Sequence, residues 1–580
     1  MISKVLIANR GEIALRVIRA CQELGLASVA VYTDPDRDSR HVKMADQAFS
    51  LGSATYLSVD ALIAIAKQAG ADAIHPGYGF LSENAPFARA VIEAGLTWIG
   101  PNPEAISLMG SKTVARRTAA SAQVPIVPGI TEALTDASVA LEFAAKHGYP
   151  CVIKAAAGGG GRGMQVVRAP EEFEAAIAKG IREGEAYFGS GEVFIERYLD
   201  KPRHIEIQIV CDQHGNAFAL GERECSIQRR HQKLIEESPS VALTPELRHA
   251  MGEAAVRMAK AVGYDSVGTC EFLFQDGCFY FLEMNTRIQV EHTVTELVYG
   301  VDLLKQQIRI AAGEPLDPHR FQNPRPHGWA IECRINAEDP SQNFRPSPGL
   351  ISRYQIPSGP GVRVDDVAYS GYRIPEQYDS LIAKVVTWGQ DREEAIARMK
   401  RALKEMVIEG VPTTIPLHLA FLDHPAFVRG DLSTHFIGQE MTSSDLSRLG
   451  SPLSEPQDPL SLRSEPRIFE VMVNRERFEV NVTEVGGRAT MTAVKPKRPG
   501  ASNSRHAAIE TGSITAPMMS LVSRVHASIG QVVKAGEPLL VLEAMKMETD
   551  ITSPIGGIIA ELHVQAGQTV EGGQLLAVVK

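Results

Sequence analysis

The chain has 580 residues, with 59 Lys plus Arg against 69 Asp plus Glu and a formal net charge of -10. This length predicts about three to five globular domains, and the acidic balance provides no broad basic face for nucleic acid. The seven cysteines are scattered and never spaced as Cys-x-x-Cys, which argues against a disulfide framework or a zinc knuckle and fits a reducing cytoplasm. No apolar stretch approaches membrane-spanning length, and the apolar run at 5–8 is typical of a β-strand rather than of a signal peptide.

Residues 1–110 predict a doubly wound α/β domain. Short β-branched runs at 5–8, 28–32, 73–75 and 97–100 alternate with Ala- and Leu-rich stretches that are typical of helices. The first turn, Asn9-Arg-Gly-Glu12, is not Gly-x-Gly-x-x-Gly, so a nicotinamide cofactor is not expected.

A glycine-rich segment, Ala157 to Met164, follows a strand-like run. Its backbone N–H groups could close over a triphosphate, although such a composition is equally typical of a flexible surface loop. Lys112, Lys154 and the basic run Gln228-Arg-Arg-His-Gln-Lys233 add positive charge for phosphates. The Walker pattern is absent, because Gly110-Ser-Lys-Thr lacks its upstream glycine.

The strongest catalytic signal is a predicted β-hairpin around Asp276-Gly277, flanked by aromatic and aliphatic residues. A two-residue turn places Glu271 opposite Leu282, so a one-residue bulge would bring Glu271 and Glu283 onto one metal. Two carboxylates with Asn285 suit Mg²⁺. The alternative, a charged solvent face of an edge strand, does not explain the apolar hairpin that leads into it.

Beyond the hairpin, polar residues recur at every second position from Glu283 to Glu291. In an extended strand they would all point the same way. The segment would then span roughly 26 Å at about 3.3 Å per residue, which exceeds one active site. We therefore expect the chain to bend if Glu283 and Glu291 cooperate.

Two polar stretches, 442–465 and 495–506, are too poor in apolar residues to order themselves and predict linkers. Between them, the runs 468–473 and 477–482 predict a small strand pair hinged at Asn474.

Residues 511–580 contain an internal repeat with an offset of 37 residues, which matches Gly530-Gln with Gly567-Gln, Gly536 with Gly573 and other positions. Two similar β-rich halves predict a flattened barrel with pseudo-twofold symmetry. The insertion Glu543-Ala-Met-Lys546-Met-Glu548 lies between the halves.

This insertion resembles the attachment site of biotin carboxyl carrier domains, in which the lysine holds biotin on a long stem that swings between sites. A lipoyl carrier is the closer rival to this reading, but lipoyl sites usually lack the paired methionines. The resemblance therefore implies covalent biotin on Lys546. One departure is Pro517-Met-Met-Ser520, where these domains commonly have Pro-Met-Pro-Gly; we expect it to alter a turn and not the attachment.

Residues 5–438 resemble the biotin carboxylase branch of the ATP-grasp enzymes. The strings that carry the resemblance are Ala8-Asn-Arg-Gly-Glu-Ile-Ala14, His75-Pro-Gly-Tyr-Gly-Phe-Leu-Ser-Glu-Asn84, Cys225-Ser-Ile-Gln-Arg-Arg-His-Gln-Lys233, Glu283-Met-Asn-Thr-Arg-Ile-Gln-Val-Glu291 and Cys333-Arg-Ile-Asn-Ala-Glu-Asp339.

The resemblance implies a role for each matched residue. ATP is expected to be bound by Lys112, Lys154, Gly160, Gly161, Glu196, Arg197, Tyr198, Leu199, His204, Gln228, His231, Glu271 and Glu283. Mg²⁺ or Mn²⁺ is expected on Glu271, Glu283 and Asn285. Bicarbonate is expected on Lys233, Arg287, Gln289 and Val290. Glu291 is the expected base, and Arg334 is expected to stabilise the enolate form of biotin, so the catalytic set is Lys233, Arg287, Glu291 and Arg334.

The whole chain resembles the α subunit of an acyl-CoA carboxylase of the acetyl- or propionyl-CoA type. Its expected parts are a doubly wound domain at 1–110, an ATP-grasp domain at 111–325 with a glycine-loop lid within about 130–205, a C-terminal biotin carboxylase domain at 326–445, a linker with the strand pair at 446–510 and an all-β biotinyl domain at 511–580.

The resemblance also implies three partners: a separate carboxyltransferase β subunit, biotin protein ligase and bicarbonate. We expect the chain to form homo- and hetero-oligomers in the cytoplasm, and we expect it to bind neither nucleic acid nor a membrane. Methylcrotonyl-CoA or pyruvate carboxylase remains the alternative. Another ATP-grasp ligase would have no use for Lys546, and a pure carrier or scaffold would have no use for the acidic run that ends at Glu291.

Overall fold

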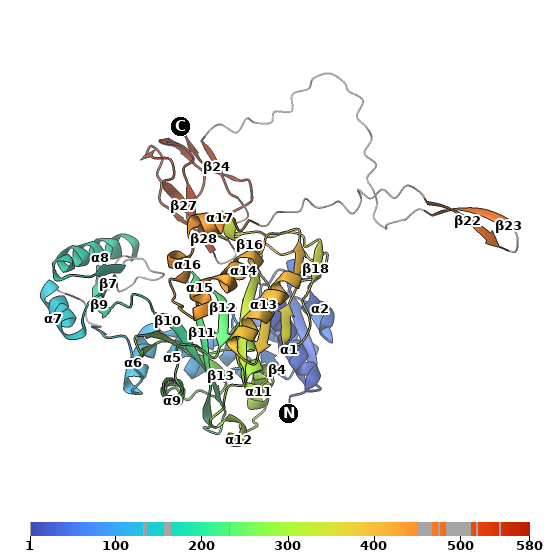
Figure 1. Cartoon of the computed structure of the whole chain (residues 1–580), viewed down its shortest axis with the longest axis horizontal. Helices are drawn as coiled ribbons and strands as arrows, with labels where there is room; N and C mark the ends of the chain where they lie inside the picture. The colour runs from blue at the N-terminus through green and yellow to red at the C-terminus, as the bar shows by residue number, and fades with distance from the viewer. Residues whose placement is uncertain are drawn as a thin grey trace. The chain divides into compact units, whose positions relative to one another are not determined.

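The computed structural model describes residues 2–130, 134, 136–155, 164–188, 191–230, 232–450, 467–473, 476–482, 512–517, 520–544 and 547–580 (Figure 1). The chain divides into two units, Met1–Ile374 with Leu381–Ser451 and Pro375–Ser380 with Pro452–Lys580. Within the described parts, we find no helix with both the length and the apolar character needed to cross a membrane.

The N-terminal part is the predicted doubly wound domain, drawn in blue in Figure 1. Five parallel strands lie in the order β3-β2-β1-β4-β5. Their bounds, with those of the helices between them, are β1 Lys4–Ile7, α1 Gly11–Glu23, β2 Ala27–Tyr32, α2 Arg40–Met44, β3 Gln47–Ser50, α3 Val59–Ala69, β4 Ala73–His75, α4 Ala85–Glu93, β5 Thr97–Trp98 and α5 Pro103–Gly110. The four strands predicted from sequence are present, and the edge strand β3 was missed because it buries no side chain fully.

A small lobe follows, with its own apolar core. Its sheet has the order β6-β9-β7-β8, and α7 and α8 pack on it. The bounds are β6 Gly129–Ile130, α7 Ala137–His147, β7 Cys151–Ala155, β8 Met164–Val167, α8 Phe173–Phe188 and β9 Val193–Arg197. The helix before the lobe, α6 Lys112–Ser121, packs on β14 Cys278–Asn285 of the central sheet instead.

An eight-stranded sheet in the order β14-β13-β10-β11-β12-β15-β20-β19 forms the centre of the first unit. Its strands are β10 Arg203–Cys211, β11 Ala217–Arg229, β12 Gln232–Ser238, β13 Val267–Gln275, β14 Cys278–Asn285, β15 Trp329–Asn336, β19 Val362–Asp366 and β20 Leu381–Gly389. Because β12 pairs with β15, the expected domains 111–325 and 326–445 contribute strands to one continuous sheet.

Helices cover this sheet and complete the first unit: α9 Pro245–Ala261, α10 His292–Tyr299, α11 Leu303–Ala311, α12 Pro318–Phe321, α13 Arg392–Glu405, α14 Ile415–Asp423, α15 Pro425–Arg429, α16 Phe436–Glu440 and α17 Ser443–Ser447. Short strands complete the list, namely β16 Glu338–Asp339, β17 Arg345–Pro346, β18 Arg353–Gln355 and β21 Val407–Glu409.

Helix α17 corrects one prediction, because a linker was expected to start at Thr442. Thr442 is instead the N-cap of the helix: its hydroxyl accepts from the Asp445 backbone N–H, and the Asp445 carboxylate accepts from the Thr442 backbone N–H. This reciprocal capping box orders the start of the polar stretch.

The predicted strand pair belongs to the second unit and consists of β22 Arg467–Val473 and β23 Glu476–Val482 in antiparallel register. Asn474, the expected hinge, lies outside the described residues, as do most positions of the two expected linkers.

The biotinyl part has two four-stranded sheets, β24-β31-β29-β26 and β28-β27-β25-β30. The bounds are β24 Ser513–Thr515, β25 Ser520–Val525, β26 Val532–Val533, β27 Pro538–Ala544, β28 Met547–Thr552, β29 Gly557–Leu562, β30 Thr569–Val570 and β31 Leu575–Val579. Adding the offset of 37 to the bounds of β25 and β26 gives those of β29 and β30, so each sheet contains strands of both halves.

Glycines at matching positions of the two halves have nearly the same backbone φ angle, which confirms the repeat. Gly530 and Gly567 have φ of 86° and 84°, and Gly536 and Gly573 have φ of 84° and 85°. The two halves therefore make the same left-handed turns at the same places.

Candidate active site

The register between β13 and β14 sets two carboxylates opposite each other. Glu271 pairs with Glu283, whereas the next pair is Phe272 with Phe281, so the register shifts by one residue at Leu282. The one-residue bulge that the sequence required for both carboxylates to meet is present. It keeps both phenylalanines in the core and turns both carboxylates to one face of the sheet.

These carboxylates fit a divalent cation. Burial and the neighbouring Glu271 charge raise the pKa of Glu283, so the facing pair carries unfavourable like-charge repulsion. Asn285 extends the polar set and donates to Glu271 Oε1 over 2.9 Å. A cation bound to Glu271 and Glu283 would relieve their repulsion, and oxygen donors of this kind suit Mg²⁺ or Mn²⁺.

Lys233 lies at the centre of a buried acidic group. Its Nζ donates to Glu206, to Glu271 Oε1 over 2.9 Å and to Glu291 Oε1 over 2.6 Å. Burial disfavours the charged amine, but the surrounding carboxylates more than offset this and raise the pKa of Lys233 well above its usual value. One ammonium group therefore holds three carboxylates in place, two from the strands β10 and β13 and one from the turn before α10.

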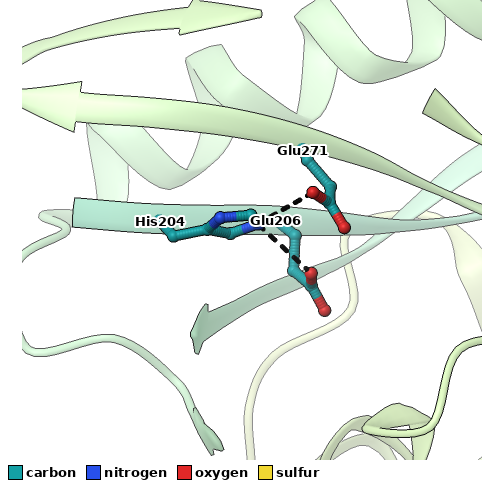
Figure 2. A group of neighbouring side chains, drawn as sticks. All are labelled: His204, Glu206 and Glu271. Atoms are coloured by element: carbon teal, nitrogen blue, oxygen red, sulfur yellow. Dashed lines mark ion pairs between the residues drawn. The ribbon is translucent and has the colours of Figure 1, made fainter. Parts of the chain in front are cut away.

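His204 approaches the same group from β10. Figure 2 shows its ring directed at the carboxylates of Glu206 and Glu271, with Nε2 lying 3.8 Å and 3.0 Å from them. Although burial alone would raise the pKa of Glu271, the Lys233 ammonium and the hydrogen bonds from Lys233 and His204 lower it below its usual range. Glu271 is therefore ionised, as a metal-binding carboxylate must be.

The chain bends after β14, as expected from the length of the polar run. The strand ends at Asn285, a turn follows, and Glu291 is the N-cap of α10. The turn places Glu291 between two cations, with Lys233 Nζ 2.6 Å from Oε1 and Arg334 Nη2 2.8 Å from Oε2. Burial opposes ionisation, but these two charges lower the pKa of Glu291 well below its usual value.

Two arginines flank Glu291. Arg334, on β15, donates through Nε to Glu236 Oε1 over 2.6 Å in addition to its contact with Glu291. Arg287 donates through Nε to Glu83 Oε2 over 2.9 Å. Glu83 lies in the N-terminal domain, so the site joins three segments that are far apart in sequence.

The residues expected to hold nucleotide lie in two groups. Lys112 begins α6, and its charge acts on Glu283. At β7 and β9, Lys154 pairs with Glu196, which also accepts from Arg116 Nη1 over 2.6 Å. Arg197 donates to the Tyr280 hydroxyl over 3.3 Å.

The remaining described residues of the nucleotide and bicarbonate sets are tied to the protein itself. The Tyr198 backbone N–H donates to the Pro150 carbonyl, and Leu199 is buried. Gln228 Nε2 donates to the Cys225 carbonyl over 2.9 Å.

Gln289 and Val290 also have protein partners. Gln289 Nε2 donates to Glu271 Oε1 over 2.7 Å, and its Oε1 accepts from Arg223 Nη2 over 2.7 Å. The Val290 carbonyl accepts from Lys384 Nζ over 2.8 Å. The amide nitrogen and oxygen of Gln289 are thus both hydrogen-bonded, and Gln289 links Glu271 to Arg223 on β11.

Four expected residues, Gly160, Gly161, His231 and Lys546, lie outside the described residues. The strands on either side of Lys546 are described, and their antiparallel register extends to the pair Ala544 and Met547.

Sequence reasoning missed a second layer of buried charge. Arg223, with no exposed surface, donates to Glu206, Gln208, Thr295, Thr269 and Gln289. Lys384, also without exposed surface, pairs with Glu12 at 3.2 Å. A signal was available in the run His204-Ile-Glu-Ile-Gln208, because polar residues at alternate positions of a β-branched run predict a polar face, here a buried one.

Four family models match this chain. They are the biotin carboxylase N-terminal domain over residues 1–106, the carbamoyl-phosphate synthase L chain ATP-binding domain over 111–319, the biotin carboxylase C-terminal domain over 332–439 and the biotin-requiring enzyme domain over 512–579.

Two curated relatives and one solved structure are close. Biotin carboxylase 1 of Bacillus subtilis is 55% identical over 443 residues, which cover 75% of this chain and 98% of that protein. The biotin-dependent acyl-coenzyme A carboxylase alpha3 subunit of Mycobacterium leprae is 46% identical over 565 residues, which cover 95% of this chain and 94% of that protein.

The solved structure is the biotin carboxylase domain dimer of Hydrogenobacter thermophilus 2-oxoglutarate carboxylase, in complex with MgADP, ADP and bicarbonate. It aligns with a TM-score of 0.68 at 48% identity, covering 76% of this chain and 97% of that chain.

Proposed function

The chain belongs to the biotin carboxylase family and carries a biotinyl domain, and on that premise we propose that it uses ATP and bicarbonate to carboxylate a biotin held on its own Lys546. We further propose that it is the α subunit of an acyl-CoA carboxylase whose carboxyltransferase is a separate subunit. The relative that spans both the catalytic and the biotinyl parts is an acyl-CoA carboxylase α subunit, which favours this acceptor class.

The observation that carries the proposal is the position of Glu291 between Lys233 and Arg334. A carboxylate kept ionised in a buried site can act as the acceptor of the bicarbonate proton. Lys233 then faces the negative charge that develops on bicarbonate, and it offsets the desolvation of that charge. Arg287 lies near enough for the Glu291 charge to act on it, and it supplies a second donor for the same anion.

Deprotonated bicarbonate would attack the γ-phosphorus of ATP and displace ADP, giving carboxyphosphate. Lys112, Lys154 and the glycine-rich segment would hold the phosphates during this step. A divalent cation on Glu271 and Glu283 would neutralise phosphate charge when bound. Carboxyphosphate would break down to CO₂ and phosphate, and this phosphate would take the proton from the biotin N1′. Arg334 would direct its donors at the ureido oxygen, where negative charge develops, while the deprotonated N1′ attacks CO₂.

The acceptor and the assembly belong to the same proposal. One similar protein is a 2-oxoglutarate carboxylase domain, so a 2-oxo acid is the competing acceptor. Self-association is also proposed, because that relative forms a dimer. Biotin protein ligase would be needed to load Lys546.

The test uses the purified full chain with ATP, Mg²⁺ and labelled bicarbonate. Label should enter the protein at Lys546 and should move to acetyl- or propionyl-CoA only after a carboxyltransferase subunit is added. Labelled CoA ester from the chain alone would show a second active site, and transfer to pyruvate or 2-oxoglutarate instead would overturn the acyl-CoA assignment.

A further inference from the structure

Two glutamates face each other directly beneath the site. Glu236 on β12 and Glu332 on β15 are paired in antiparallel register, and neither has any exposed surface. Side chains at directly opposed positions of antiparallel strands have Cβ atoms about 4.5–5.5 Å apart. The two carboxyl groups therefore share one small buried space, closed above by α10, whose Val294 and Val298 pack against Ala330 and Val386.

Each carboxyl group uses one oxygen for a defined partner. Glu236 Oε1 accepts from Arg334 Nε over 2.6 Å and also lies 2.5 Å from Arg334 Nη2. Glu332 Oε2 accepts from the Thr293 hydroxyl of α10. For the other two oxygens, Glu236 Oε2 and Glu332 Oε1, the described part of the chain supplies no donor. Leaving two buried acceptors unsatisfied is costly, and two ionised carboxylates cannot satisfy each other.

The charged groups around the pair do not cancel two negative charges. Arg334 follows on β15, Lys384 lies on β20 and Lys233 lies on β12, but Arg334 and Lys233 are shared with Glu291 and Lys384 is shared with Glu12. Burial, only partly offset by these cations, raises the pKa of Glu332 to about 8 and that of Glu236 to about 7. The unsatisfied oxygens and the charge balance therefore both indicate that the two carboxyl groups are not ionised together.

We propose that Glu236 and Glu332 share one proton, carried as an O–H of Glu332 that donates to Glu236 Oε2, and that the pair thereby positions Arg334. Glu236 then keeps one negative charge, which holds Arg334 through both Nε and Nη2, while Nη2 also reaches Glu291 beside the space where biotin must enter. If both carboxyls ionised, their doubled charge would draw the guanidinium back between β12 and β15. Glu236 and Glu332 are positioning residues that act through Arg334, and this inference rests on the proposed function.

The first experiment measures carboxylation of free biotin by the full chain as a function of pH. Glu332→Gln retains a donor to Glu236 and an acceptor for Thr293, so its rate should stay within about threefold of wild type near pH 7. Wild type should lose biotin carboxylation above pH about 8, where the second carboxyl ionises, and Glu332→Gln should not show this loss. Glu332→Leu should lose biotin carboxylation about tenfold or more while ATP cleavage without biotin persists.

The matched control is Glu237→Gln, the next residue on β12, which pairs with Arg392 over 2.7 Å on the other face of the sheet. It removes a buried carboxylate from the same strand without touching the Arg334 side, so its pH profile should follow wild type. A high-pH loss that persists in Glu332→Gln, or a Gln variant as impaired as the Leu variant, would overturn the inference.

The second experiment reads the proton directly and does not need the reaction. Infrared difference spectra of wild type minus Glu332→Gln at pH 7 should contain the C=O stretch of a protonated carboxyl that disappears above pH about 8. Its absence overturns the shared proton even if biotin carboxylation is normal. Its presence in a chain that fails to carboxylate biotin would instead overturn the proposed function alone.

Discussion

The central sheet of the catalytic unit and the two sheets of the biotinyl domain bury opposite kinds of residue. The face shared by β10 to β15 buries Arg223, Glu206, Glu236 and Glu332, all with no exposed surface. The core of the biotinyl domain is made of aliphatic residues such as Leu540 and Val570. Buried charges are tolerated only when each has a partner, whereas an aliphatic core needs only volume and shape.

This difference shows that the same residues serve both reaction and stability on the catalytic sheet but not in the biotinyl domain. On the catalytic sheet the same side chains hold the strands together and set the charge of the reacting groups. In the biotinyl domain the core supports the fold, and the proposed chemistry belongs to Lys546, which follows β27 and precedes β28 in the sequence. Substitutions in the biotinyl domain should therefore change either stability or chemistry. Substitutions on the catalytic sheet should change both.

Lys546→Ala should have the largest effect, a complete loss of covalent biotin and of self-carboxylation. The barrel should still fold because its core is intact, and the catalytic unit should still cleave ATP when free biotin and bicarbonate are supplied. Avidin blotting checks the modification. Lys534→Ala, elsewhere in the same domain, is the control and should give the same avidin signal as wild type. An avidin signal that persists in Lys546→Ala would contradict the assignment of biotin to Lys546.

Glu291→Gln should reduce bicarbonate-dependent ATP cleavage by about 10²–10⁴-fold, because the amide cannot accept the bicarbonate proton. Nucleotide binding, measured by calorimetry, should be retained because the nucleotide residues lie elsewhere. Activity within a few-fold of wild type would remove Glu291 from the mechanism.

Arg334→Ala should lose carboxylation of free biotin by about 10²–10³-fold while keeping appreciable ATP cleavage. Carboxyphosphate can still form and decompose, since Glu291 retains Lys233 as a partner. Phosphate release and label on biotin are measured in parallel. Equal loss of both activities would contradict separate roles for Glu291 and Arg334.

Arg223→Met on the catalytic sheet and Leu540→Ala in the biotinyl core compare the free energy of unfolding of the two regions. Removing one member of a buried ionic network costs about 3–5 kcal/mol, because the fully buried Glu206 loses a charged partner. Calorimetry should show the catalytic transition lowered and the biotinyl transition unchanged. Leu540→Ala in the biotinyl core should do the reverse, at about 2–5 kcal/mol.

The smallest effect tests the symmetry of the biotinyl domain. Gly530→Ala and Gly567→Ala each force an L-residue into the left-handed region at φ of 86° and 84°, with no neighbouring atom near the added Cβ. Each should cost about 1–2 kcal/mol through backbone strain alone. The two costs should agree within error; a clear difference would show that the halves are not equivalent in energy.

Much of this molecule could be predicted locally. The repeat, the strands near residues 5, 28 and 73, and the hairpin that carries Glu271 and Glu283 follow from spacing, because strand periodicity and turn length fix which side chains share a face. Helix α17 was also predictable in principle, since Thr442 and Asp445 have capping-box spacing. The edge strand β3 gave no such signal, because it has no buried apolar alternation.

The sequence by itself determined the biotinyl repeat, the hairpin that carries Glu271 and Glu283 and the polar run that ends at Glu291, whereas the bulge that sets Glu271 opposite Glu283 is a finding of the structure. Only the tertiary structure decided which cations hold those carboxylates. Lys233, Arg334 and Glu291 come from β12, β15 and the turn before α10, and Glu236 meets Glu332 only because β12 pairs with β15. The reason is physical: strand pairing between distant segments sets the distances between charges, burial removes the water that would screen them, and their ionisation depends on both.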